Sequence, residues 1–227
     1  MRYFTFFIFS LLSYPMVGQT EEAKHYALFF AVEDYDAFRK LNNPIKNAEE
    51  IAAVLEAQYD FTTEVVSNPA LDEIDAKLKA YQEGFEAGTY EQESQLLIFF
   101  SGHGLRENRN GYFLPKDANP EKVYNTGLGY EYWREYINKI DCKHIMVMID
   151  ACFSGTFDPD WWSRSGKNFA RPGELSEAES LLLEHKKYKT RIFFTSATEV
   201  DSPVRSRIAY RILEGLRSGG GTDGILT

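Results

Sequence analysis

Residues Leu96–Gly104, LLIFFSGHG, and residues His144–Gly155, HIMVMIDACFSG, decide the fold of this chain. In each stretch a short, continuous apolar run is followed by a polar segment that contains glycine. Such runs are typical of strands that are buried on both faces of a parallel sheet. Parallel strands end at a common edge, and open α/β sheets build their sites there. We therefore expect the imidazole of His103 and the thiol of Cys152 to face each other across that edge.

Strands and helices alternate along the rest of the chain, which predicts an α/β fold with helices on both faces of a mostly parallel sheet. Besides the two quoted runs, short apolar runs predict strands at 26–32, 61–66 and 191–195, an extended piece at 111–114, and the start of a last strand at 225–226. Apolar residues at helical spacing predict helices over 45–59, 71–85, 128–140 and 208–216, and a more charged helix over 175–183.

Length and charge restrict the possible functions. The 227 residues fit one α/β domain, or one such domain plus a short extension. The formal net charge of −9 repels phosphate backbones, so we expect no nucleic-acid partner.

Residues 1–20 have the pattern of a signal peptide. Arg2 supplies the positive charge, residues 3–12 are almost wholly apolar, and Gly18 is a small residue at a suitable cleavage point. The apolar stretch is shorter than the ~20 residues of a membrane-spanning helix. An uncleaved anchor or a buried strand is the alternative. We expect export to the periplasm or the cell exterior, no stable membrane insertion after cleavage, and a folded domain over 21–227.

The chain has two cysteines, Cys142 and Cys152. The residues between them predict a strand, and a strand rises about 3.3 Å per residue. The two Cα atoms would therefore lie farther apart than the roughly 7 Å that a disulfide tolerates. We expect Cys152 to be a free thiol.

The residue types at the shared edge suit the attack of a thiol on a carbonyl group. A histidine can take the thiol proton and return it to the leaving amine. The oxyanion of the tetrahedral intermediate needs N–H donors, for which the backbone amides of Gly104 and Cys152 are the candidates. Gly102 and Gly104 leave room for a peptide backbone. Taken singly, His103 would more often be structural and a strand-end cysteine would only pack, but the combination favours catalysis.

Other chemistries lack their motifs. Asp158 stands where a Cys-x5-Arg phosphatase loop needs arginine, and no Gly-x4-Gly-Lys-Ser/Thr phosphate loop occurs. Glu107 replaces the third glycine of a dinucleotide-binding fingerprint. No His-Glu-x-x-His site is present, and the other histidines have no ligand-like neighbours. The sequence therefore predicts no metal site.

The segments Ser101–Gly104 and Asp150–Gly155 resemble the histidine and cysteine motifs of the caspase-like cysteine peptidases, especially the metacaspase or bacterial caspase-domain type of peptidase family C14. Weaker similarities occur in the family's order over 26–227, at 27–34, 41–48, 111–115, 195–197, 213–217 and 223–227. The resemblance implies a caspase-like three-layer sandwich with a six-stranded sheet. It also implies a cysteine endopeptidase that cleaves peptide or protein substrates through a Cys–His dyad.

The same resemblance divides the domain into two parts. A large-subunit-like part extends to about residue 158, a loop over 158–173 stands where such proteins are processed, and a small-subunit-like part begins near residue 189. The resemblance implies no bound cofactor. Metacaspases are often calcium-dependent, but no calcium loop is evident in this sequence.

Substrate preference is also expected from the resemblance. Asp150 matches an acid that helps to form the pocket for a basic side chain before the scissile bond (P1), and a carboxylate suits Arg or Lys. A structural hydrogen bond to a neighbouring loop is the alternative role for this acid. Asn47 stands where the family has a second acid, so the pocket has less charge than usual. Asp34 and Asp201 could replace that charge, and Ser101 is a further candidate substrate-binding residue.

Leu41 and Val204 stand where animal caspases carry the arginines that bind Asp substrates, so a basic P1 residue is favoured over an acidic one. Arg164, Lys167 and Arg171 in the loop are then candidate self-cleavage sites, although a solvated loop would contain such residues too.

Two other functions remain open from the sequence. A caspase-like module without activity could bind partners through the same cleft. A different α/β hydrolase or a nucleotide-binding domain is the third possibility. His103 and Cys152 favour the peptidase because a binding module needs neither residue.

Overall fold

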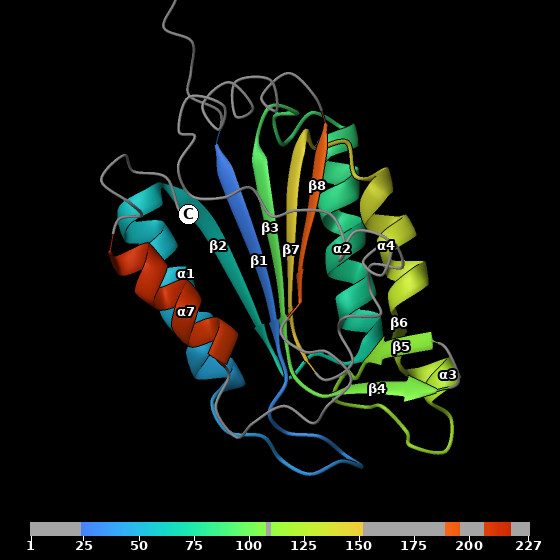
Figure 1. Ribbon diagram of the computed structural model, residues 1–227. Coiled ribbons are helices and arrows are strands. Elements are labelled where there is room, and N and C mark those ends of the chain that lie inside the picture. Colours follow the sequence, from blue (N-terminus) through green and yellow to red (C-terminus); the bar gives the residue numbers. More distant parts are fainter. Residues whose placement is uncertain (1–23, 108–109, 152–188, 196–206, 219–227) are drawn as a thin grey trace, which may run out of the picture.

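The computed structural model describes residues 24–107, 110–151, 189–195 and 207–218. Five parallel strands form its main sheet in the order β2-β1-β3-β7-β8 (Figure 1). These strands are β1 (His25–Ala31), β2 (Phe61–Ser67), β3 (Gln95–Ser101), β7 (His144–Asp150) and β8 (Thr190–Thr195). The five strands and their common direction confirm the parallel sheet predicted from the apolar runs.

Helices cover both faces of this sheet. Figure 1 shows α1 and α7 on one face and α2 and α4 on the other. Their bounds are α1 (Pro44–Tyr59), α2 (Leu71–Glu86), α4 (Tyr130–Lys139) and α7 (Arg207–Arg217). The predicted three-layer α/β sandwich is therefore confirmed.

Alternating side chains of the central strands supply the two cores. In β1, Leu28 and Phe30 pack with the α2 and α4 side of the sheet, whereas Phe29 packs with the α1 and α7 side. All three side chains are fully buried. A strand covered on both faces has no reason to alternate apolar with polar residues, which explains why the sequence shows continuous apolar runs.

A small antiparallel sheet follows β3. It has the order β4-β5-β6 and consists of β4 (Gly104–Glu107), β5 (Asn110–Phe113) and β6 (Leu128–Gly129), with the short helix α3 (Val123–Thr126) before β6. The extended piece predicted at 111–114 corresponds to β5, which begins one residue earlier and ends at Phe113. The helix predicted over 128–140 begins only at Tyr130, because Leu128 and Gly129 pair with β5.

Several predictions concern residues outside the described part. These are the signal peptide, the charged helix over 175–183, the strand start at 225–226 that would make a sixth strand, and the loop over 158–173 with Arg164, Lys167 and Arg171. The candidate pocket residue Asp201 and Val204, which bears on the P1 preference, also lie outside the described residues. Within the described residues, none of the helices combines the length and the hydropathy that crossing a membrane requires.

The strand order reverses its direction between β1 and β3. The chain leaves β1 for β2 on one side and returns to β3 on the other side of β1, and α1 and α2 lie on opposite faces. The chain after β1 leads to α1 on one face and the chain after β3 leads to α4 on the other, so the loops that follow these two strands meet at the carboxyl edge. Such a switch point is where open α/β sheets bind ligands.

Candidate active site

The strand register aligns the two motifs. Ser101 at the end of β3 is the Cα partner of Asp150 at the end of β7. The pairing continues past the strand end, because the Gly102 N–H donates to the Asp150 carbonyl at 3.2 Å. His103 and Cys152 each follow this register pair by two residues in the sequence. Cys152 itself lies outside the described residues, which end on this strand at Ala151.

The His103 ring is held by the loop that follows β1. Its Nε2 atom lies 2.9 Å from the Arg39 carbonyl oxygen. A carbonyl oxygen can only accept, so Nε2 carries the proton and donates it. The ring also packs against Tyr35 and Phe38, with centroid distances of 4.8 and 6.2 Å. In the neutral imidazole Nδ1 is then the unprotonated nitrogen, which is the form that a general base needs.

Burial lowers the pKa of His103 from its ordinary value of 6.5. The hydrogen bond to the Arg39 carbonyl raises this pKa and the Arg39 charge lowers it, but the loss of hydration is the largest effect. At neutral pH the imidazole is therefore mainly uncharged and able to accept a proton.

This shift predicts the titration of His103. In the Cys152→Ala variant, which has no thiolate to couple with the imidazole, the NMR titration midpoint of His103 is expected below 6.5. The urea-unfolded chain is the control and should titrate near 6.5. The unfolded chain binds this proton more tightly than the folded chain does. The contribution of His103 to the free energy of unfolding is therefore complete above the unfolded pKa, and it is lost as the pH falls through the folded pKa. A folded midpoint above that of the unfolded chain would contradict the geometry.

Tyr35 fixes the backbone of the histidine loop. Its hydroxyl oxygen accepts the His103 N–H at 2.7 Å, and burial raises the pKa of this tyrosine. A Cβ atom added to Gly102 would lie 2.6 Å from that hydroxyl and 3.1 Å from the Phe113 ring. Gly102 therefore allows Tyr35 and Phe113 to approach the chain, which is a different role from the room for a substrate backbone that we expected.

The small sheet determines the direction of the Gly104 N–H. The Leu114 N–H donates to the His103 carbonyl at 2.9 Å, so these two residues lie at a hydrogen-bonded position of the hairpin. Gly104 is the Cα partner of Phe113 at the next position. Hydrogen-bonded and non-hydrogen-bonded pairs alternate between antiparallel strands, so the Gly104 N–H faces away from β5. This direction suits a donor to an external oxyanion.

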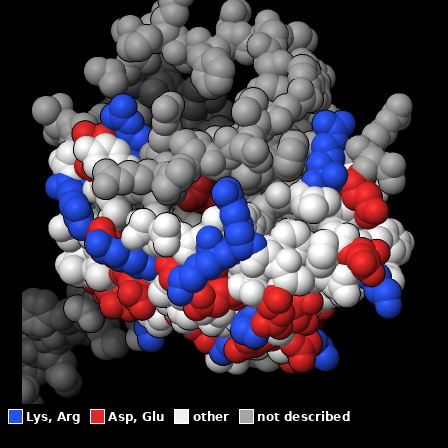
Figure 2. All heavy atoms as spheres, turned by 90° about the horizontal axis from the view of Figure 1, so that it is seen from below, with Lys and Arg blue, Asp and Glu red and all other residues white. Residues whose placement is uncertain are grey.

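The neighbouring loops support the loop that holds His103. The Asn68 side-chain oxygen accepts the backbone N–H groups of Glu33 and Asp34, at 2.8 and 3.0 Å. Lys116 pairs with Asp36 at 2.7 Å. Figure 2 shows this edge of the molecule, where cationic and acidic side chains lie side by side. The loop after β1 is thus tied to the loops after β2 and β5.

The candidate substrate-binding residues differ in their surroundings. Asp150 and Ser101 are buried neighbours on adjacent strands, with 7% and 2% of their surfaces exposed. Asp34 is exposed and pairs with Lys40 at 2.7 Å, so a cation of this chain already neutralises it. Asn47 lies half-buried in the first turn of α1.

Cys142 is not suited to be a nucleophile. It is fully buried before β7, and its thiol donates to the Ser94 carbonyl at 3.1 Å. Burial raises the pKa of this thiol to about 11, against smaller opposing effects of hydrogen bonds and of Arg191. The strand predicted between the two cysteines is β7, which supports the expectation that they form no disulfide.

Sequence reasoning missed Tyr35 and the Arg39 carbonyl. Tyr35 was not singled out because a tyrosine in a polar loop has no chemical signature, and a backbone carbonyl has none at all. The topology could have indicated both, because the loop after β1 borders β3 at the switch point. Among the described residues, no group of three or more His, Cys, Asp or Glu side chains could hold a metal ion.

Comparison with known proteins decides the family. The model of the caspase domain, Peptidase_C14, matches residues 24–209, which is most of the chain. The chain belongs to the caspase-domain family. The resemblance found in the sequence is thereby confirmed, and so is the caspase-like class of the fold.

A solved caspase-domain structure is also similar. The Drosophila initiator caspase Dronc shares 13% sequence identity with this chain and superimposes with a TM-score of 0.45. The match covers 55% of this chain and 47% of the Dronc chain. No curated protein matches the chain.

Proposed function

We propose that this caspase-domain protein is a cysteine endopeptidase in which Cys152 is the nucleophile and His103 the base. The observation that carries the proposal is the state of His103. Its Nε2–H is bound to the Arg39 carbonyl and its pKa is lowered, so an unprotonated Nδ1 is available at the carboxyl edge. The β3–β7 register supports the pairing, because the cysteine follows Asp150 as the histidine follows Ser101.

The reaction follows from these positions. Nδ1 of His103 takes the Cys152 proton, and the thiolate attacks the carbonyl carbon of the scissile peptide bond. The N–H groups of Gly104 and Cys152 stabilise the oxyanion. The imidazolium then protonates the leaving amine, and a thioester remains on the enzyme. Water activated by the neutral imidazole hydrolyses this thioester and regenerates the thiol.

We further propose a preference for Arg or Lys at P1. Asp150 ends β7 as a largely buried acid two residues before the cysteine, and a desolvated carboxylate binds guanidinium strongly. Asp34 contributes less than Asp150 because Lys40 neutralises it. Self-processing at Arg164, Lys167 or Arg171 would fit the same preference.

Three further expectations complete this proposal. The protein is exported after cleavage of a signal peptide at residues 1–20, it uses no cofactor, and it acts on peptide or protein substrates. A calcium requirement would rest on the family resemblance alone.

Labelling with peptidyl acyloxymethyl ketones tests class and preference together. The wild-type chain should gain one label from the probe with Arg at P1, and less from the probe with Asp. The Cys152→Ala variant should gain none, because Cys142 is buried and its thiol has a raised pKa. Intact mass spectrometry after incubation would also reveal self-cleavage. An unlabelled wild-type chain would favour the alternative, a caspase-like binding module.

A further inference from the structure

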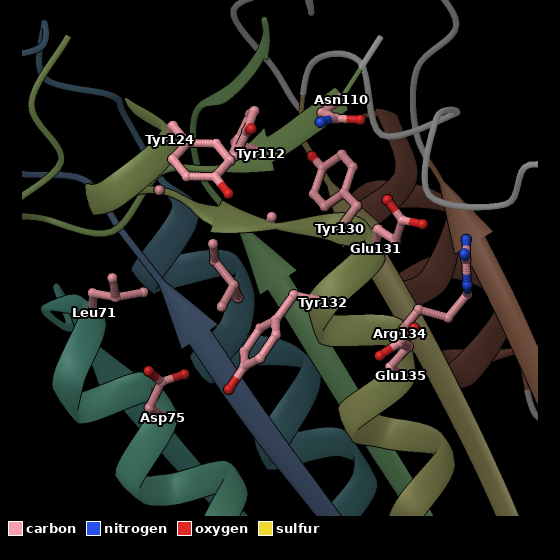
Figure 3. Close-up of a pocket in the computed structure, with 14 residues that line it drawn as sticks. Leu71, Asp75, Asn110, Tyr112, Tyr124, Tyr130, Glu131, Tyr132, Arg134 and Glu135 are labelled. Atoms are coloured by element: carbon pink, nitrogen blue, oxygen red, sulfur yellow. The ribbon is translucent and has the colours of Figure 1, made fainter. Parts of the chain in front are cut away.

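A cavity lies away from the sheet edge that carries His103. Its volume is about 740 Å³, and it opens between α2, α4 and the small sheet (Figure 3). None of the candidate catalytic or substrate-binding residues lines it. Its lining is rich in tyrosines and carboxylates, with one arginine: Tyr112, Tyr124, Tyr130, Tyr132, Asp75, Glu131, Glu135 and Arg134.

Two of these tyrosines are unusually exposed. Tyr124 has 76% of its surface exposed and Tyr132 has 60%, although large aromatic side chains are mostly buried. Figure 3 shows Tyr132 extending from α4 toward α2, where Asp75 lies. The face of a tyrosine ring attracts cations, and a nearby carboxylate strengthens that attraction. This arrangement therefore suits a cationic group.

The charges around the cavity favour the same ligand. Three carboxylates line it against a single cation, Arg134. Burial and the neighbouring Asp72 raise the pKa of Asp75. Carboxylates of α2, including Asp75 and Glu86, also contribute to the raised pKa of Tyr136 on α4, after the effects of burial and Tyr132. Carboxylates of α2 therefore lie close enough to the α4 tyrosines to act on them across this groove.

We propose that this cavity binds an arginine- or lysine-bearing segment of a partner protein. Cationic side chains of the segment lie against the exposed rings of Tyr124 and Tyr132, and Asp75 and Glu135 balance their charge. A cavity of this size accommodates one or two side chains of an extended segment. The proposal concerns binding at a distance from His103 and does not depend on peptidase activity.

Fluorescence anisotropy on the full-length Cys152→Ala chain tests this proposal without cleavage of the probe. The probe is a fluorescein-labelled hexapeptide, Gly-Arg-Lys-Gly-Arg-Gly, and the same peptide with glutamates in place of its cationic residues is the comparison. Adding Asp75→Asn and Glu135→Gln should weaken binding of the basic probe about tenfold or more, because two charge-assisted contacts are lost. Adding Glu49→Gln and Glu56→Gln on α1 gives the same change in net charge on the opposite face and should leave Kd unchanged. Both double variants keep the side-chain shapes, and thermal melting verifies their folding.

Four results would overturn the proposal. The first two are that the basic probe does not bind, or that the acidic probe binds equally well. The third is that the Glu49→Gln/Glu56→Gln control weakens binding as much as the cavity variant does. The fourth is that Asp150→Asn abolishes binding whereas the cavity variant Asp75→Asn/Glu135→Gln binds normally. The last result would place the peptide in the proposed P1 pocket. Because the assay measures binding only, a chain without peptidase activity that still binds the probe at the cavity would contradict the proposed function and leave this inference intact.

Discussion

Replacement of Cys152 by Ala is expected to abolish peptide cleavage, and replacement of His103 by Ala to lower kcat/KM by about 10³-fold or more. The thiol forms the covalent intermediate, whereas the imidazole only transfers protons, so its removal leaves a small residual rate. The measurement is kcat/KM on a fluorogenic peptide with Arg at P1, over a range of pH. The variant that combines Cys152→Ala with His103→Ala should be no slower than Cys152→Ala alone, because the two side chains act in the same step.

Matched residues elsewhere in the fold provide the controls. Cys142→Ala removes the other thiol, which lies buried before β7. His144→Gln removes an imidazole whose Nδ1 lies 2.9 Å from the Thr190 hydroxyl. Both variants should retain kcat/KM within a few-fold of the wild type when folded. A His103→Ala variant with nearly full activity would refute the proposed dyad.

Gly102→Ala is expected to destabilise the fold by about 1–3 kcal/mol and to lower kcat/KM about tenfold or more. The new methyl group would lie 2.6 Å from the Tyr35 hydroxyl, a separation that real Cβ contacts do not show. Tyr35 must then move, and the oxygen that accepts the His103 N–H moves with it. If His103 is the base, its displacement by a fraction of an ångström would lower the rate in a fold that still forms.

Gly129→Ala is the matched control for this substitution. A Cβ there would meet the Tyr112 ring at 3.5 Å, which is ordinary contact, and the backbone φ of −65° suits any residue. Urea denaturation should show little change for this variant. In a Tyr35→Phe background, which lacks the clashing oxygen, Gly102→Ala should cost less stability than it does in the wild type. Equal effects of the two glycine substitutions would show that the contact with Tyr35 has no special importance.

The continuous apolar runs by themselves determined the strands and their burial. Leu96–Phe100 and His144–Ile149 predicted β3 and β7 within a residue of their bounds. Because side chains on both faces of such a parallel strand are buried, a continuous apolar run in the sequence is enough to predict the strand and its burial. The two glycine-containing motifs also located the edge of the sheet at which a site would form, and their likeness to caspases indicated the family.

Tertiary structure alone decided how the side chain of His103 is held. The Arg39 carbonyl fixes the tautomer of His103, and Tyr35 fixes its backbone, from a loop more than sixty positions earlier in the chain. It also decided that Gly102 makes room for a tyrosine. These contacts depend on the switch between β1 and β3, which brings distant loops together. A local pattern of residues predicts burial, but it does not predict which backbone atom of a distant segment a side chain will contact.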